Sequence, residues 1–170
     1  IGQEYLTGKD GIITKMIENN HLQSFVLYGG PGTGKTTIGK IIKEMYSLES
    51  YEFNASSDSK AILQEITNLT KFYPNVILII DEIHRKDTQD YLLPYLEDGR
   101  ITIIGLTTSN PYISINKAIR SRLNIYQMNS ITEKDIVNLL KRTIKLDEFK
   151  DLQIDDEVLK LIANMSGCEI

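Results

Sequence analysis

A glycine-rich segment at residues 29–36 has the residue types and spacing needed to bind phosphate. It reads Gly-Gly-Pro-Gly-Thr-Gly-Lys-Thr and matches the pattern G-x-x-x-x-G-K-[ST]. The glycines let the backbone turn so that successive N–H groups converge on phosphate oxygens, and a following helix adds its positive N-terminal end. Lys35 supplies a charge for β- and γ-phosphates, and the Thr36 hydroxyl is a ligand for Mg²⁺. The segment therefore predicts a nucleotide site.

Two carboxylates, Asp81 and Glu82, follow the apolar run at residues 76–80. In open α/β sheets, ligands bind at the carboxyl ends of the strands. Asp81 would hold Mg²⁺ through water, and Glu82 would orient or deprotonate an attacking water. Acidic residues after a strand are also common helix caps. Beside a phosphate loop, however, the pair predicts a hydrolase.

Polar residues also follow the apolar segment at 101–106. Thr107, Thr108 and Asn110 could sense the γ-phosphate or position the water, or they could simply form a turn. Further along, Arg122 follows a short helical stretch at 115–120. An arginine that reaches a neighbouring subunit's γ-phosphate would stabilise transition-state charge. By its sequence alone, Arg122 could equally face solvent.

The elements that must position these residues alternate between strands and helices. Short apolar runs bounded by turn residues alternate with segments whose apolar residues recur every three or four positions. This alternation predicts an α/β domain with a central parallel sheet, and the run at 76–80 should be covered on both faces. We expect strands at 24–28, 51–54, 76–80 and 101–106, and helices at 36–46, 60–70 and through 90–97.

The character of the chain changes after about Asn129. Ser130 and Glu133 have the spacing of a capping box, which predicts a helix to about Lys145. Asp155 is expected to cap a second helix that ends near Gly167. Consecutive helices without strands predict a second unit. We expect a nucleotide-binding α/β domain at 1–128 and a truncated helical lid domain at 129–170.

The composition is that of an ordinary globular protein. The 170 residues are 41% hydrophobic and 25% charged, which excludes disorder and collagen, and a single cysteine excludes a disulfide scaffold. The longest apolar run is five residues, against roughly 20 needed to cross a bilayer. A net charge of −4 does not favour nucleic-acid binding through bulk charge. We expect a cytoplasmic protein without membrane contact and, because the chain begins with Ile1, a piece of a longer one.

Taken together, the motifs resemble those of AAA+ ATPases and, among them, the replication-associated recombination protein A family, which is related to the Werner-helicase-interacting protein. The detailed likeness covers essentially the whole chain and is more specific than the phosphate loop alone. It is carried by Asp-Glu-Ile-His-Arg at 81–85, Gln-Asp-Tyr-Leu-Leu-Pro at 89–94, Gly-Leu-Thr-Thr-Ser-Asn-Pro at 105–111 and Ala-Ile-Arg-Ser-Arg at 118–122.

The resemblance implies a role for each matching position. Asp81 and Glu82 would be the Walker B pair, Thr108 the sensor at the strand end, and Arg122 a finger that acts on the neighbouring subunit. Thr36 and Asp81 would be the metal-binding residues. The nucleotide would be bound by Gly30, Pro31, Gly32, Thr33, Gly34, Lys35, Thr36 and Thr37, with Gln3 and Leu6 on the adenine side.

Other positions keep two interpretations. Asn54 resembles a residue that restrains the catalytic glutamate in related proteins, or it is a turn residue. His84 follows Asp81 and Glu82 and could contact the site, but a capping or packing role is the expected one. Ile170 stands where a second sensor arginine would be expected. The basic residues could form a DNA-facing or subunit-facing strip or a solvated face; they are Lys117, Arg120, Lys134, Lys141 and Arg142.

The function implied by the resemblance is Mg²⁺-dependent ATP hydrolysis on DNA at stalled or damaged replication forks. The expected partners are single-stranded, gapped or forked DNA, replication proteins and copies of the same chain, assembled as a homotetramer in a full-length protein but not in this piece. The expected location is the bacterial cytoplasm, associated with the nucleoid. The alternatives are a clamp-loader or branch-migration subunit, and a nucleotide-binding assembly module that does not hydrolyse ATP.

Overall fold

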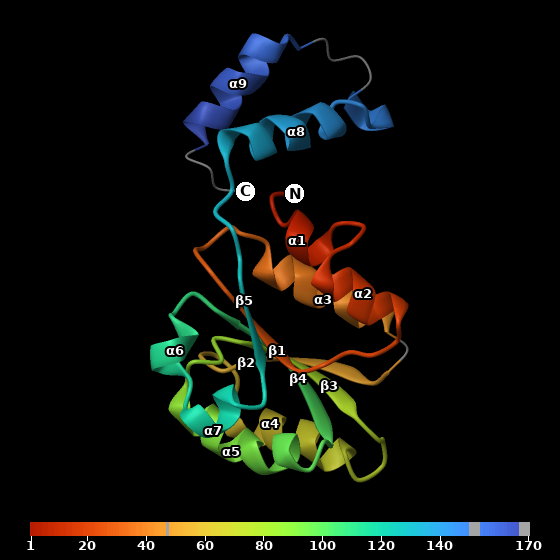
Figure 1. The fold of residues 1–170 in the computed structure, drawn as a ribbon, viewed down its shortest axis with the longest axis vertical. Coiled ribbons are helices and arrows are strands. Elements are labelled where there is room, and N and C mark those ends of the chain that lie inside the picture. Colours follow the sequence, from red (N-terminus) through yellow and green to blue (C-terminus); the bar gives the residue numbers. More distant parts are fainter. Residues whose placement is uncertain (47, 150–153, 167–170) are drawn as a thin grey trace.

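The computed structural model describes residues 1–46, 48–149 and 154–166. Its centre is a five-stranded sheet in the order β2-β3-β4-β1-β5, with every neighbouring pair parallel (Figure 1). The predicted α/β class with a parallel sheet is therefore confirmed. The strands are β1 (Phe25–Tyr28), β2 (Ser50–Asn54), β3 (Val76–Asp81), β4 (Ile101–Thr107) and β5 (Asn124–Gln127).

Helices cover both faces of the sheet, as Figure 1 shows. Along β3, Ile77 and Ile79 pack with α1–α3, whereas Leu78 and Ile80 pack with α4, α5 and α7. Because both faces are covered, β3 needs no polar alternation. The helices are α1 (Glu4–Thr7), α2 (Ile12–Glu18), α3 (Lys35–Met45), α4 (Lys60–Leu69), α5 (Lys86–Glu97), α6 (Pro111–Ser114), α7 (Lys117–Arg120), α8 (Glu133–Thr143) and α9 (Asp156–Met165).

The parallel arrangement brings the functional loops to one edge of the sheet. Tyr28, at the end of β1, pairs with Thr107 at the end of β4. Asp81, at the end of β3, pairs with Leu106. The phosphate loop after β1 therefore lies at the same edge as the residues that follow β3 and β4.

The last two helices pack against each other outside the sheet (Figure 1). Their small core contains Ile131, Ile136 and Ala163, whereas Met128 packs in the core of the sheet. This change of core agrees in position with the division expected between residues 128 and 129, which stays a prediction. None of the helices in the described part of the chain is long and apolar enough to span a membrane.

The start of α8 differs from the prediction. Its N-cap is Thr132, which forms a capping box with Asp135, rather than Ser130 with Glu133. Both pairs have the same spacing, but burial of Ile131 in the small core places Ser130 before the helix. β5 is not predicted at all because its residues are only partly buried, so its apolar signal is weak.

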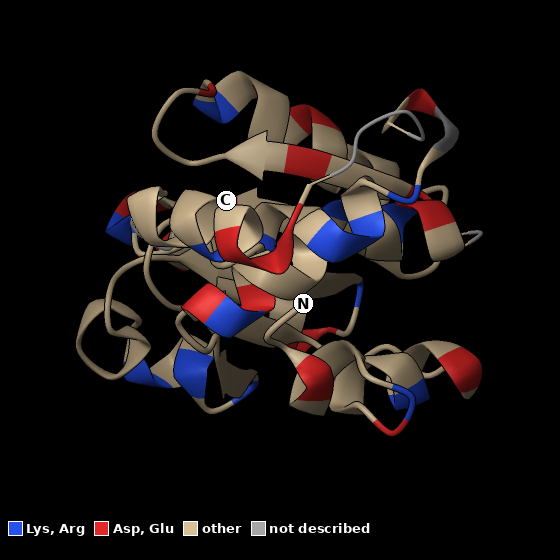
Figure 2. Ribbon diagram, turned by 90° about the horizontal axis from the view of Figure 1, so that it is seen from above, with Lys and Arg blue, Asp and Glu red and all other residues tan. Residues whose placement is uncertain are grey.

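The basic residues considered as a strip do not form one. Lys117 and Arg120 belong to α7, below the sheet in Figure 1, whereas the others belong to α8 above it. One of these, Lys141, is paired with Asp156 at 2.6 Å. Seen from above, basic and acidic residues are interspersed over the ribbon (Figure 2). The solvated-face interpretation therefore fits the fold better.

Candidate nucleotide-binding site

The phosphate loop has the conformation that its glycines allow. Gly32 and Gly34 have φ angles of 69° and 91°, in the left-handed region that side chains rarely adopt. Gly34 is the N-cap of α3, so the loop leads directly into the helix. A Cβ atom at Gly30 or Gly34 would meet nothing within 4 Å. The inner side of the loop is thus open beside the positive end of a helix, as an anion site requires.

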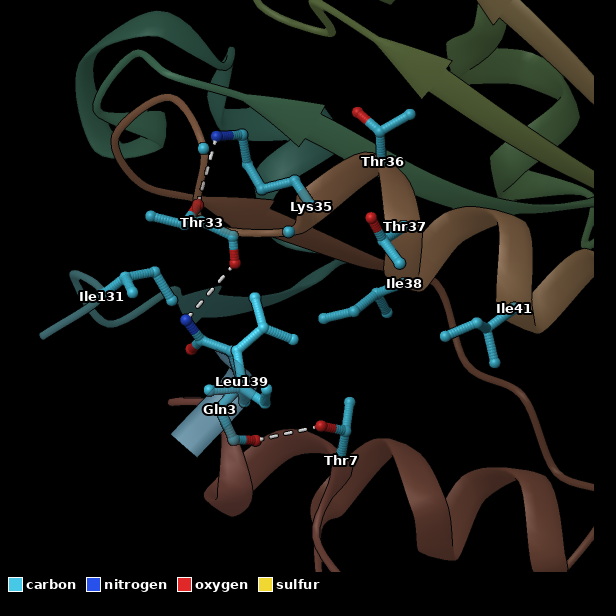
Figure 3. Close-up of a pocket in the computed structure, with 13 residues that line it drawn as sticks. Gln3, Thr7, Thr33, Lys35, Thr36, Thr37, Ile38, Ile41, Ile131 and Leu139 are labelled. Carbon is cyan, nitrogen blue, oxygen red and sulfur yellow. Dashed lines mark hydrogen bonds between the residues drawn. The ribbon is translucent and has the colours of Figure 1, made fainter. Parts of the chain in front are cut away.

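Lys35 is held against its own loop (Figure 3). Its Nζ donates to the carbonyl oxygens of Gly29 at 2.9 Å and Gly30 at 2.7 Å, and the residue is only 8% exposed. Burial lowers the pKa of Lys35, while Asp81 and Glu82 act in the opposite direction. The buried Lys35 ammonium group is therefore hydrogen-bonded to neutral carbonyl groups. An anionic ligand would stabilise its charge more than these carbonyls do.

A pocket of about 470 Å³ lies between this loop, α1 and the start of the C-terminal helices. One wall is polar and comes from the loop, and the other is largely apolar, as Figure 3 shows. Its size and mixed lining suit a small ligand with a charged end and a ring. The lining residues are Ile1, Gln3, Thr7, Gly32, Thr33, Gly34, Lys35, Thr36, Thr37, Ile38, Ile41, Ile131 and Leu139.

The two residues predicted on the adenine side have different places. The side-chain amide of Gln3 donates to the Asn129 carbonyl at 2.8 Å, and its oxygen accepts from the Asn129 N–H at 2.9 Å. Gln3 therefore ties the pocket wall to the segment that leads to α8. Leu6 is fully buried in the core and does not line the pocket, so it supports α1 instead of facing the ligand. Gly30 and Pro31 also lie outside the lining.

The Walker B carboxylates lie at the end of β3. Asp81 closes the strand, and its Oδ1 accepts the N–H of Glu82 at 3.0 Å. Glu82 has a φ of 57°, a strained conformation for a residue with a side chain, of the kind that concentrates at functional sites. Its Oε2 is buried without a hydrogen-bond partner among the described residues, 2.9 Å from His84 Nδ1.

The polar residues at and after the end of β4 have three different surroundings. Thr107, the last residue of the strand, is 1% exposed, and its hydroxyl lies 3.2 Å from His84 Nδ1. Thr108, the predicted sensor, is exposed just beyond the strand end. Asn110 is the N-cap of α6 and accepts from the Tyr112 N–H, so it serves as a capping residue.

The structure distinguishes between the two interpretations of Asn54 and of His84. The Asn54 side-chain oxygen accepts from the N–H groups of Ser56 at 2.8 Å and Ser57 at 3.2 Å, which is a turn role. For His84 the structure favours the less expected interpretation, because its ring contacts the carboxylate of Glu82. The available signal was its position two residues after a proposed catalytic glutamate.

Arg122 lies at the opposite edge of the sheet, just before β5 begins. Its guanidinium pairs with Glu97 Oε1 at 2.7 Å and donates to the Ala118 carbonyl at 2.7 Å. Strands of four residues, roughly 13 Å, separate this edge from the phosphate loop. The structure therefore does not bring Arg122 to its own chain's phosphate loop.

A buried glutamine that the sequence analysis did not single out for a role connects the two edges. Gln89 is 1% exposed and donates to the carbonyls of Ile83 and Ser114, both at 3.0 Å. Its oxygen accepts from the Asn116 N–H at 2.8 Å. Ile83 belongs to the loop that carries Glu82, and Asn116 caps α7, which leads to Arg122.

The available ligands suit Mg²⁺ only together with phosphate and water. The described residues contain no cluster of three or more acidic, histidine or cysteine side chains that could hold a metal. A hydroxyl from Thr36 and a carboxylate from Asp81 are hard oxygen donors, and Mg²⁺ commonly takes one or two carboxylates and completes its shell with substrate phosphates and water. The residues present therefore fit this ion.

Comparison with known proteins agrees with this geometry. The family described as "ATPase family associated with various cellular activities (AAA)" matches residues 25–130. The chain belongs to the AAA family. It is 41% identical to replication-associated recombination protein A of Bacillus subtilis, which it matches over 100% of its own length and 42% of the relative's. It is 38% identical to ATPase WRNIP1 of Dictyostelium discoideum, over 98% of this chain and 20% of that one.

The family resemblance seen in the motifs is thus confirmed. The chain spans less than half the length of these two relatives. Among solved structures, the RuvB Holliday junction branch migration motor of Thermotoga maritima superposes with a TM-score of 0.78 at 26% identity. The match covers 99% of this chain and 58% of RuvB. This likeness includes the C-terminal helices, and it confirms the predicted AAA+ core; the assignment of the C-terminal helices to a lid stays a prediction. The place expected for a second sensor, Ile170, lies outside the described residues.

Proposed function

We propose that this AAA chain is the nucleotide-binding and catalytic part of a Mg²⁺-dependent ATPase that acts on DNA during replication-associated recombination. The observation that carries the proposal is the shared edge of the sheet. The phosphate loop with Lys35 and the Asp81–Glu82 pair come from strands that end at this edge. A carboxylate next to a phosphate loop is needed for hydrolysis and not for binding alone.

In the proposed mechanism, the loop at 30–37 binds the phosphates of ATP through its N–H groups. Lys35 exchanges the carbonyls of Gly29 and Gly30 for phosphate oxygens, a stronger pairing because the new partners are charged. Thr36 and Asp81 would hold Mg²⁺, which would neutralise charge on the phosphates. Glu82 orients the attacking water, and Thr108 contacts the γ-phosphate from the end of β4.

Arg122 completes the site of a neighbouring copy. It is too far from its own phosphate loop, and its only charged partner among the described residues is Glu97 on the surface. Delivered from a neighbour, it would stabilise the charge that develops on the γ-phosphate. We therefore propose a homo-oligomer, a tetramer in the full-length protein, with residues 1–128 as the α/β domain and 129–170 as the beginning of the lid.

The DNA role rests on the relatives. Two of them are named for replication-associated recombination and for WRNIP1, and a structural neighbour is a branch migration motor. We propose single-stranded, gapped or forked DNA and replication proteins as partners, in the bacterial cytoplasm and close to the nucleoid. Branch migration at Holliday junctions is the second candidate, favoured by the RuvB structure, although identity to the recombination proteins is higher.

The test is the ATP hydrolysis rate of the full-length protein at fixed salt, because phosphate contacts are strongly screened. The rate is measured without DNA and with single-stranded, gapped, forked and four-way-junction DNA, with Lys35→Ala as the inactive control. Stimulation by gaps or forks supports the proposal, and selective stimulation by junctions supports the second candidate. A rate equal to that of Lys35→Ala would overturn the hydrolase assignment.

A further inference from the structure

The ring of His84 lies between side chains from two neighbouring strand ends. Nδ1 is 2.9 Å from Glu82 Oε2 and 3.2 Å from Thr107 Oγ1. Glu82 directly follows β3, and Thr107 is the last residue of β4, which pairs with β3. The imidazole therefore bridges the two strand ends that supply the proposed water-positioning carboxylate and γ-phosphate sensor.

The oxygen neighbours of the ring require a proton on Nδ1. An ionised carboxylate can only accept a hydrogen bond, so a lone pair on Nδ1 would face the Glu82 oxygen with repulsion. The Thr107 hydroxyl already accepts the N–H of Ser109 at 3.0 Å and has a second lone pair free to accept from the ring. One N–H group thus has two acceptors.

The two contacts are not equivalent. The geometry of the Thr107 contact satisfies a hydrogen bond, whereas Glu82 Oε2 is close to the ring but buried without a hydrogen bond. A buried carboxylate oxygen in that state is unfavourable unless a donor reaches it. A small rotation of the imidazole would move the N–H from Thr107 to Glu82 and satisfy that oxygen.

We propose that His84 is a positioning residue for Glu82, holding its carboxylate through the Nδ1–H that it shares with Thr107. The inference rests on the proposed hydrolysis by Glu82 and deepens it. Thr107 adjoins Thr108, so a displacement of the β4 end by the γ-phosphate would change which oxygen, that of Thr107 or that of Glu82, accepts the hydrogen bond from Nδ1–H. In the described part of the chain, His84 is the only side chain in polar contact with the Glu82 carboxylate.

The first test separates positioning from binding. In the full-length protein, His84→Ala should lower kcat between about tenfold and about 100-fold, the effect of a misplaced reacting group, with KM and ATP affinity unchanged. His84→Asn should recover most of kcat, since its amide N–H can take the place of Nδ1–H. The matched control is His21→Asn, on an exposed residue outside the site, which should leave kcat unchanged.

The second test asks whether His84 acts through Glu82. In a Glu82→Gln background, adding His84→Ala should lower the remaining rate by less than about twofold, because residues that act as a unit are not additive. An undiminished additional loss would overturn the proposal. So would wild-type kcat in His84→Ala, or no difference between the Ala and Asn variants.

A third measurement does not depend on activity. The ¹⁵N spectrum of the imidazole, assigned by the signal that disappears in the His84→Asn variant, should show His84 protonated at Nδ1. An Nε2–H tautomer would overturn the inference while leaving the hydrolase assignment intact. If the wild-type protein hydrolyses ATP no faster than Lys35→Ala, the proposed function and the role of His84 both fail. Hydrolysis that is sensitive to Lys35 and indifferent to His84 refutes only the latter.

Discussion

The two cationic side chains proposed to contact phosphate, Lys35 and Arg122, lie at opposite edges of the sheet and in opposite surroundings. At the carboxyl edge, Lys35 is buried against the carbonyls of its own loop and faces a pocket. At the amino edge, Arg122 is exposed, with its guanidinium on the surface carboxylate of Glu97. The first edge presents a binding site preformed within one chain. The second presents a group whose weak surface pairing is readily exchanged for a stronger partner.

This contrast shows that phosphate binding and ATP hydrolysis have different structural requirements. Phosphate binding needs converging N–H groups and one desolvated cation, which a single strand–loop–helix unit supplies. Charge stabilisation in the transition state needs a further cation at the γ-phosphate. This fold places its candidate for that cation, Arg122, at the far edge of the sheet, and in the proposed mechanism a second copy of the chain supplies it.

Mixed protomers give the strongest test of this contrast. In the full-length oligomer, Lys35→Ala and Arg122→Ala should each lower hydrolysis, by about 1,000-fold or more for Arg122→Ala. Mixing the two should restore part of the rate, because an intact Arg122 then meets an intact Lys35 across some interfaces. The steady-state rate as a function of mixing ratio measures this effect.

The control for that experiment is a protomer that carries both substitutions. It cannot restore activity to either single variant if the two residues act across an interface. Rescue by the double variant, or no rescue in any mixture, would contradict the assignment of Arg122 to a neighbouring site.

Gln89 links the two edges, and replacing it should lower the free energy of unfolding more than the other substitutions proposed here. Gln89→Leu leaves the N–H of Asn116 and the carbonyls of Ile83 and Ser114 without their buried partner. We expect the free energy of unfolding to fall by about 2–4 kcal/mol, measured by urea denaturation. Gln64→Leu, on an exposed position of α4, is the matched control and should change it by less than about 0.5 kcal/mol.

The burial of Lys35 gives a pH-dependent test. Its pKa is lowered by burial in the folded chain, whereas the unfolded chain keeps the ordinary value of 10.5. Between these values the unfolded state binds more protons, so this group makes the free energy of unfolding rise with pH. We expect that free energy, relative to Lys35→Met, to increase as the pH rises through the lowered pKa of Lys35 towards 10.5, by less than about 1.4 kcal/mol per pH unit.

Urea denaturation of both chains at each pH provides the measurement, and the subtraction removes the titration of the other groups. Equal slopes for wild type and Lys35→Met would show that the Lys35 ammonium is as well solvated as a surface lysine. The contrast between the edges would then lie in position alone.

Breaking the Arg122–Glu97 pair should have the smallest effect. Both side chains are more than a third exposed, and ion pairs of this kind contribute little to stability. Glu97→Gln should change the free energy of unfolding by less than about 0.5 kcal/mol. A loss comparable to that of Gln89→Leu would show that Arg122 is a structural group and would weaken its proposed role at a neighbouring site.

Much of the fold could be predicted because the signals are local. The apolar run before Asp81 identifies a strand covered on both faces, and the glycine-rich segment identifies the loop between β1 and α3. β5 escaped prediction because its residues are partly exposed, and the start of α8 moved to Thr132 because two equally spaced pairs compete for the cap. Burial of Ile131 decides between them.

From chemistry and spacing alone, the sequence identifies the residues proposed to bind and hydrolyse the phosphates, which are the loop glycines, Lys35 and the Asp81–Glu82 pair. Only the three-dimensional packing of separate elements shows that Leu6 lies in the core and that His84, beside Glu82, meets Thr107. Leu6 of α1 packs with strand residues, and the contact between His84 and Thr107 joins the segment after β3 to the end of β4, so these contacts bring together elements that are far apart in the sequence. Strand order and register decide which side chains meet, and neither is written in any local pattern.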